Sequence, residues 1–199
     1  DCLKELTTEW LPKLLCDADS EVLGGAAALT ASLARMHAEV GLPWDLLTAN
    51  AEHFVGILSP GQVPSAQIAL HAARHFASSA ATAGAALPCA SKLAVAVCRR
   101  GNEVASQYEK EAAGYSTQDA ENQPDLVALA KAAEDAERAM ACILLASGGG
   151  SSEAEAKAAV EKLAGGLDGK EAKLLRDYAS KRLRCILPHC GDSNFAWDF

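Results

Sequence analysis

The sequence lacks the patterns that mark β-strands and membrane spans. β-Branched residues are scarce, and no stretch alternates apolar and polar residues between turns. No run approaches the roughly 18 strongly apolar residues of a transmembrane helix, and the uncharged stretch of residues 76–91 is mostly Ala, Ser, Thr and Gly. No signal or transit peptide is visible. These absences favour a soluble, all-α protein without a transmembrane segment.

Motifs of the common enzyme classes are also missing. The chain has no nucleophile elbow, Walker loop, dinucleotide fingerprint, Cys-x-x-Cys or His-Glu-x-x-His. The carboxylates Glu134, Asp135 and Glu137 are expected on a solvated helix face, where nothing pairs them for acid–base catalysis. The net charge of −8 repels phosphate backbones. We therefore expect neither an enzyme nor a nucleic-acid-binding protein.

What the 199-residue chain has in excess is alanine, with 42 residues, whereas only 5% of the chain is aromatic. Alanine is the best helix former, and its small side chain lets helices approach closely. In several segments small or apolar residues recur at alternating steps of four and three, for example Ala90, Ala94, Val97, Gly101 and Val104. We expect an antiparallel helical bundle of about six to eight helices with heptad-like packing seams.

Capping residues and prolines mark several helix ends. Ser152 and Asp168 each stand three residues before a glutamate, which is the spacing of a capping box. Pro188 is expected to end the last helix, because proline cannot donate the backbone hydrogen bond that would continue it. The chain is therefore expected to form one helical-bundle domain, residues 1–187, followed by a C-terminal docking tail, residues 188–199.

Two histidines, His71 and His75, stand one turn apart on an expected helix, a spacing that can hold zinc or haem iron. A metal site needs more ligands, and no carboxylate lies within a turn on the same face of that helix. Amphipathic residues at the edge of a buried stripe are the simpler interpretation. No metal site is predicted, and the sequence indicates no particular cofactor.

Seven cysteines are many for a chain of this size. They suit disulfides in an oxidising compartment, with one thiol left over, although cysteine is also a small buried hydrophobe in helices. We favour disulfides, and with them an extracellular, cell-surface or organelle-lumen location over the cytoplasm. A bridge between the two cysteines that flank Pro188 is one option. The cysteines that could take part are Cys2, Cys16, Cys89, Cys98, Cys142, Cys185 and Cys190.

The last helix and the tail carry the residues that point to a partner. Basic residues near a helix C-terminus interact well with the helix dipole, but six of them exceed what capping needs and could form a docking face for an acidic partner or an anionic surface. The aromatic residues of the tail are expected to be buried against the bundle or against another chain. The docking candidates are Lys170, Lys173, Arg176, Lys181, Arg182, Arg184, Phe195, Trp197 and Phe199.

Taken together, these features predict a non-enzymatic interaction or scaffold protein. It would be a subunit of a larger assembly or a surface component, with a protein partner or self-association. The alternative is a carrier of an apolar ligand such as a lipid or pigment, because the small-residue stretch 77–90 could leave a slot between helices. Close helix packing is the other explanation of that stretch. A third option is an enzyme with a dispersed site that uses His71, His75 or the cysteines.

Overall fold

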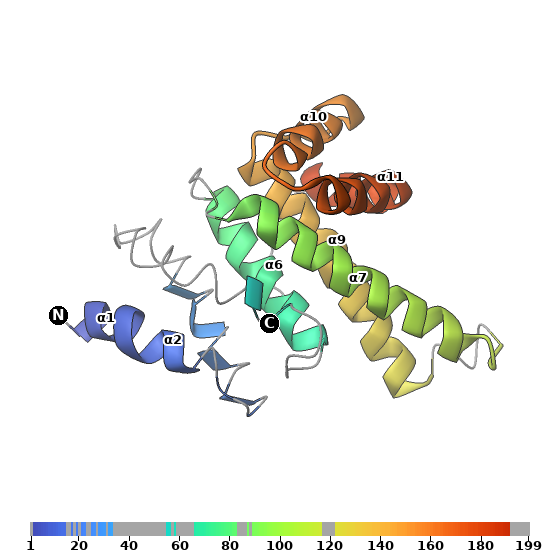
Figure 1. Cartoon of the computed structure of the whole chain (residues 1–199). Helices are drawn as coiled ribbons and strands as arrows, with labels where there is room; N and C mark the ends of the chain where they lie inside the picture. Colours follow the sequence, from blue (N-terminus) through green and yellow to red (C-terminus); the bar gives the residue numbers. More distant parts are fainter. Residues whose placement is uncertain are drawn as a thin grey trace.

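The architecture of the chain is entirely helical in the part that can be described. A computed structural model describes residues 2–14, 17, 19, 21–22, 25–26, 28–30, 32–33, 55–56, 58, 66–82, 87, 89–116 and 122–191, with the backbone alone at 66–68, 72, 75, 79 and 82. Every regular element in these ranges is a helix, and the helices pack against one another (Figure 1). The prediction of an all-α helical bundle is confirmed.

The helices form an N-terminal run and a main group. In the run, α1 (Cys2–Glu5), the π-helical turn η1 (Leu6–Trp10) and α2 (Leu11–Leu14) follow one another without a break. The main group consists of α6 (Ala66–Thr82), α7 (Ala90–Ala112), α9 (Pro124–Ala146), α10 (Glu153–Ala164) and α11 (Gly169–Gly191). Helices α7 and α9 run side by side, and the pair α10 and α11 lies toward one end of them (Figure 1).

Helix α9 is the centre of the packing, because it contacts α6, α7 and α11. From Ala139 to Leu144 every residue of α9 is at most 1% exposed. Helix α6 packs most extensively on α9, and its residues Ala73, Ala77 and Ala80 are buried. Small side chains let the two backbones approach closely. In the described part, the small-residue stretch therefore belongs to the packed core.

The crossing of α7, α9 and α11 is tightest at Gly101 in α7. A Cβ atom on Gly101 would lie 2.7 Å from Oη of Tyr178 in α11 and 3.1 Å from Cβ of Ala136 in α9. A residue with a side chain would overlap Tyr178 and crowd Ala136. The Tyr178 side chain is buried, and its Oη has no hydrogen-bond partner among the described residues. Burial raises the pKa of this phenol, so it stays neutral.

The predicted capping at the start of α10 is confirmed. Ser152 Oγ accepts a hydrogen bond from the backbone N–H of Glu155, whose Oε2 accepts one from the backbone N–H of Ser152. At the start of α11, Asp168 Oδ1 likewise accepts from the backbone N–H groups of Lys170 and Glu171. Both caps satisfy amide groups that the helices leave without an intrahelical partner.

Replacing Ser152 by alanine is expected to lower the free energy of unfolding by about 1 kcal/mol, because the α10 cap is lost. Urea unfolding of the full chain measures the change. The control is Ser151→Ala, which leaves both hydrogen bonds of the cap in place and should have no effect. Equal stability of the two variants would show that the cap adds nothing.

The prediction that Pro188 ends the last helix is wrong, because α11 continues to Gly191 with Pro188 inside it. Leu187 and Cys190, on either side of Pro188, are packed against the core. This packing holds the last turn in place and offsets the hydrogen bond that proline removes. The division of the chain into a domain and a tail stays a prediction.

None of the described helices is both long enough and apolar enough to cross a lipid bilayer.

Candidate functional site

The main candidate site is a stripe of basic side chains on α11. Lys170, Lys173, Lys181 and Arg184 are exposed. Together with Asp177 they step along the helix by 3, 4, 4 and 3 residues, which places all five on one face. The buried side chains of α11, including Leu175 and Ala179, lie on the opposite face. We call these four cations the α11 stripe; at 1.5 Å per residue it is about 21 Å long.

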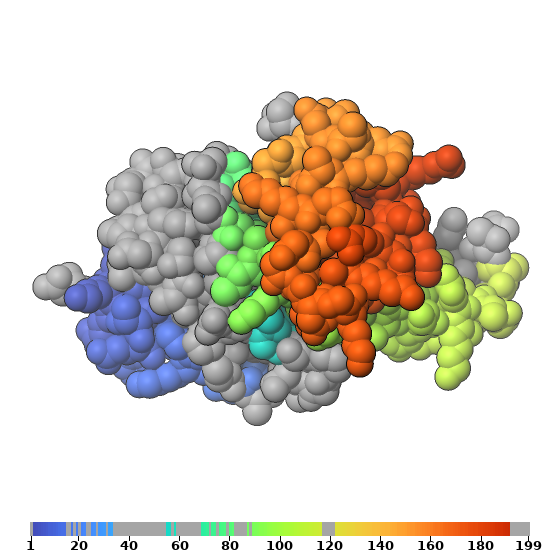
Figure 2. All heavy atoms as spheres, turned by 45° about the horizontal axis from the view of Figure 1, so that its top comes forward, coloured from blue at the N-terminus to red at the C-terminus, as the bar shows by residue number. Residues whose placement is uncertain are grey.

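The four cations of the α11 stripe form no ion pair with any described residue. Arg184 does lie near enough to Glu153 to help lower the pKa of that carboxyl, after the larger effect of Lys157. Asp177 in the middle of the stripe reduces its net charge to +3. The space-filling view shows the outer surfaces of α10 and α11 as one continuous face of the molecule (Figure 2).

The two other basic candidates of α11 bind within the chain. Nε and Nη2 of Arg176 donate to the carboxylate of Glu161 on α10, the shortest N–O distance being 2.6 Å. Nη1 of Arg182 lies 2.7 Å from Oε1 of Glu137 on α9. These two arginines therefore hold α11 against its neighbours. The sequence alone did not distinguish them from the four cations of the α11 stripe.

A second polar cluster lies between α6 and α9, around Asp135. This residue is 1% exposed. Its Oδ1 lies 2.7 Å from Nη1 of Arg74, and its Oδ2 lies 3.4 Å from Nδ1 of His71. Burial would raise the pKa of Asp135, but the hydrogen bonds and charges of His71 and Arg74 together lower it below its ordinary value. Asp135 is thus ionised and paired.

The expectation that Asp135 and Glu137 lie unpaired on a solvated face is wrong for both residues. Asp135 faces α6, and Glu137 faces Arg182 of α11. Glu134 is half exposed and forms an ion pair with Arg138, one turn along the same helix. One pattern in the sequence could have indicated that Asp135 is buried: alanines stand three residues before it and four residues after it, on the same helix face. Alanine is too weakly apolar for this to mark a buried face clearly.

The structure places a carboxylate beside the first histidine of the pair, His71. His71 lies against Asp135, whereas the side chain of His75 lies outside the described residues. Among the described residues, no group of three or more His, Cys, Asp or Glu side chains is arranged to hold a metal ion. The cluster is therefore best understood as an ion-paired contact between α6 and α9.

The six cysteines that the structure describes are free thiols, and Cys16 lies outside the described residues. No disulfide therefore joins any two of these six. Cys185 and Cys190 both lie in the continuous helix α11. Five residues of helix separate Cα atoms by about 8.6 Å, beyond the reach of a disulfide. The option of a bridge across Pro188 fails because α11 does not end there.

The buried thiols are poor candidates for nucleophiles. Burial raises the pKa of Cys98, and it raises that of Cys142 to about 12. The half-buried Cys190 also has a raised pKa because of burial. A thiol must ionise to attack a substrate or bind a metal. These three cysteines therefore serve as small core residues.

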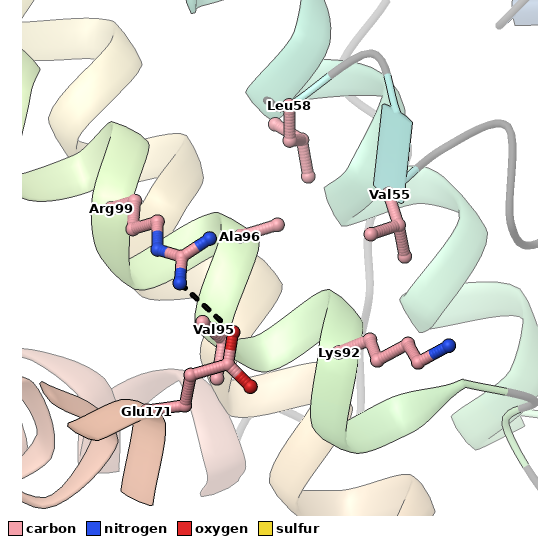
Figure 3. A pocket seen from close by; sticks show the side chains of 7 residues that line it. All are labelled: Val55, Leu58, Lys92, Val95, Ala96, Arg99 and Glu171. Carbon is pink, nitrogen blue, oxygen red and sulfur yellow. Dashed lines mark hydrogen bonds and ion pairs between the residues drawn. The ribbon is translucent and has the colours of Figure 1, made fainter. Parts of the chain in front are cut away.

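A small cavity of about 170 Å³ lies beside α7. Val95 and Ala96 form its floor, and Lys92 and Arg99 flank them on the same helix face (Figure 3). Nη2 of Arg99 lies 2.9 Å from Oε1 of Glu171, which closes the cavity from α11. This volume is below the roughly 300 Å³ at which sites for small organic ligands usually begin.

The aromatic docking candidates Phe195, Trp197 and Phe199 lie outside the described residues. Comparison with known proteins gives no matching family model, no matching curated protein and no matching solved structure. The geometry of this chain is therefore the whole basis for a functional proposal.

Proposed function

We propose that this protein is a non-enzymatic interaction or scaffold protein, a subunit of a larger assembly or a surface component, that docks to an acidic partner through the α11 stripe. The observation that carries the proposal is a set of four exposed cations on one face of α11 that form no ion pair with any residue the structure describes. The protein as a whole has a net charge of −8, whereas α11 has six basic and two acidic residues. An isolated positive face on an acidic protein steers and orients acidic partners.

The alternative, a carrier of an apolar ligand, has less support. The cavity beside α7 is small, and the larger apolar groove, of about 340 Å³, lies between α10 and α11 and not at the small-residue stretch 77–90. The small residues of α6 that the structure describes are used in contacts with other helices. Lipid or pigment in an organic extract of the purified protein would support the carrier instead. The proposal of an extracellular, cell-surface or organelle-lumen location rests on the number of cysteines alone, because the six described cysteines are free thiols. Thiol counting before and after reduction tests it.

Charge reversal on the stripe is expected to abolish partner binding. The test compares the full-length wild type with the double variant Lys173→Glu/Lys181→Glu, each used to recover partners from the native source. We expect at least tenfold less partner with the variant, and release of the partner from the wild type as salt rises, because the attraction between exposed charges is screened.

The matched control is Lys110→Glu/Lys131→Glu, which makes the same change of net charge at exposed lysines of α7 and α9. This control should recover the partner as the wild type does. Equal recovery with both double variants, or equal loss with both, would contradict docking through the stripe.

A further inference from the structure

An apolar groove of about 340 Å³ lies between α10 and α11. Val160 of α10 and Ala179 and Leu183 of α11 form its floor, each no more than 7% exposed. Lys157 and Arg176 stand at its rim, paired with glutamates of α10. On an ideal helix, the α11 residues that line the groove lie next to the edge of the α11 stripe that carries Lys173 and Arg184.

The size of the groove selects the kind of occupant. Along α11 it extends from Arg176 to Leu183, which is about 10 Å of helix. A stable interface with a separate protein needs about 800 Å² from each partner, far more than this groove offers. A segment tethered nearby needs much less contact, because the tether supplies an effective concentration in the millimolar range. The groove therefore fits a short segment of this chain.

We propose that residues 192–199 of the same chain bind in this groove. These residues follow Gly191, the last residue of α11, and lie outside the described part of the chain. A Cβ atom on Gly191 would lie 4.0 Å from Cβ of Ser151, just before the start of α10. The segment therefore begins where the two helices that form the groove meet.

The length of the segment matches the groove. An extended chain spans at most about 3.3 Å per residue, so Phe195 reaches about 13 Å from Gly191 and Phe199 about 26 Å. Along α11, Leu183 lies about 12 Å and Arg176 about 22 Å before Gly191. Turning back along α11 takes up about three residues, so residues 195–199 can extend about 16 Å beside the helix, which brings Phe199 past Leu183 and into the groove.

The side chains of the segment also suit the apolar groove and the cations beside it. Phe195, Trp197 and Phe199 alternate along the sequence, so an extended conformation places all three on one side. Aromatic side chains gain strongly from burial on an apolar floor. The segment also contains Asp192 and Asp198, and the groove lies beside the cations of the α11 stripe, which form no ion pair with a described residue. Apolar contact and charge therefore favour the same occupant.

Fluorine NMR of the full chain labelled with 5-fluorotryptophan tests the proposal. The chain has three tryptophans, and Trp197→Phe assigns the resonance of Trp197. The reference is the free synthetic peptide of residues 192–199. We expect the Trp197 resonance of the protein to be displaced from its position in the peptide, and this displacement to be unchanged on dilution.

The variant Ser180→Glu places a bulky negative charge at the groove from an exposed position, and should return the resonance to the peptide position. Its matched control is Ser106→Glu, the same change at an exposed position of α7, which should leave the resonance displaced. A wild-type resonance already at the peptide position would overturn the proposal. So would a displacement that Ser180→Glu does not reduce, or one that disappears on dilution, which would indicate a second copy.

Discussion

Replacing Asp135 by alanine is expected to lower the free energy of unfolding by about 3 kcal/mol. The carboxylate is buried between α6 and α9, and its Oδ1 lies 2.7 Å from Nη1 of Arg74. Removing one partner of a buried ion pair leaves the other charge without compensation, which usually costs about 3–5 kcal/mol. The Arg74 side chain retains 14% exposure, which puts the expected loss at the lower end. Urea unfolding of the full chain measures it.

The control for this prediction is Glu134→Ala, one residue away. Glu134 is paired with Arg138 at the surface, where its side chain is 48% exposed. Surface ion pairs contribute roughly 0–1 kcal/mol, so this variant should unfold almost as the wild type does. If Asp135→Ala lowered the free energy of unfolding as little as Glu134→Ala does, the ion pair between Asp135 and Arg74 would not be a stabilising contact.

The free energy of unfolding at acid pH should depend on the carboxyl group of Asp135. The pKa of Asp135 is lowered in the folded protein, so its stabilising contribution is present above the unfolded-state pKa of about 3.9. It is lost as the pH falls through the lower pKa of the folded state. The stability difference between the wild type and Asp135→Asn should therefore be constant near neutral pH and shrink below about pH 4. A difference independent of pH would contradict the pairing.

Replacing Gly101 by alanine is expected to lower the free energy of unfolding by about 1–3 kcal/mol. The new Cβ atom would overlap Oη of Tyr178 and crowd Cβ of Ala136. Helix propensity acts in the opposite direction, because alanine is better than glycine by about 1 kcal/mol in a helix interior. We expect the overlap to win, because both neighbours are buried and cannot move aside.

The control is Gly169→Ala in the first turn of α11, where a Cβ atom would meet nothing within 4 Å. That variant should keep or raise the stability. Tyr178→Phe should also be neutral or stabilising, because Oη has no hydrogen-bond partner among the described residues. When the two changes are combined, Tyr178→Phe should restore part of the stability that Gly101→Ala removes. Strictly additive effects would show that Tyr178 is not the obstacle.

The helix class and several helix ends could be predicted from the sequence because their causes are local. Ser152 caps α10, as expected, and Pro124 stands in the first turn of α9, where proline is favoured. The stepping pattern of α7 also identified its buried side, including Ala94, Val97 and Gly101. Proline geometry, side-chain capping and helical periodicity act within a few residues of chain, so a linear sequence contains them.

The errors concern residues whose role depends on another helix. Asp135 looked solvated because its partners come from α6, about sixty positions earlier in the chain. Pro188 looked like a helix end because the packing that carries α11 past it comes from the core. Among the six basic candidates of α11, the paired and unpaired cations differ only in which acidic side chains the neighbouring helices place beside them.

By itself, the sequence determined that this protein is an acidic, alanine-rich helical bundle with a basic last helix. Composition, capping and periodicity are properties of short stretches, and they survive whatever the helices pack against. Only the tertiary structure decided which charges are buried, which are paired and which remain on the surface. Those outcomes depend on contacts between residues far apart in the chain. The proposals made above rest on two of them, the cations of α11 that no described residue pairs and the groove beside them.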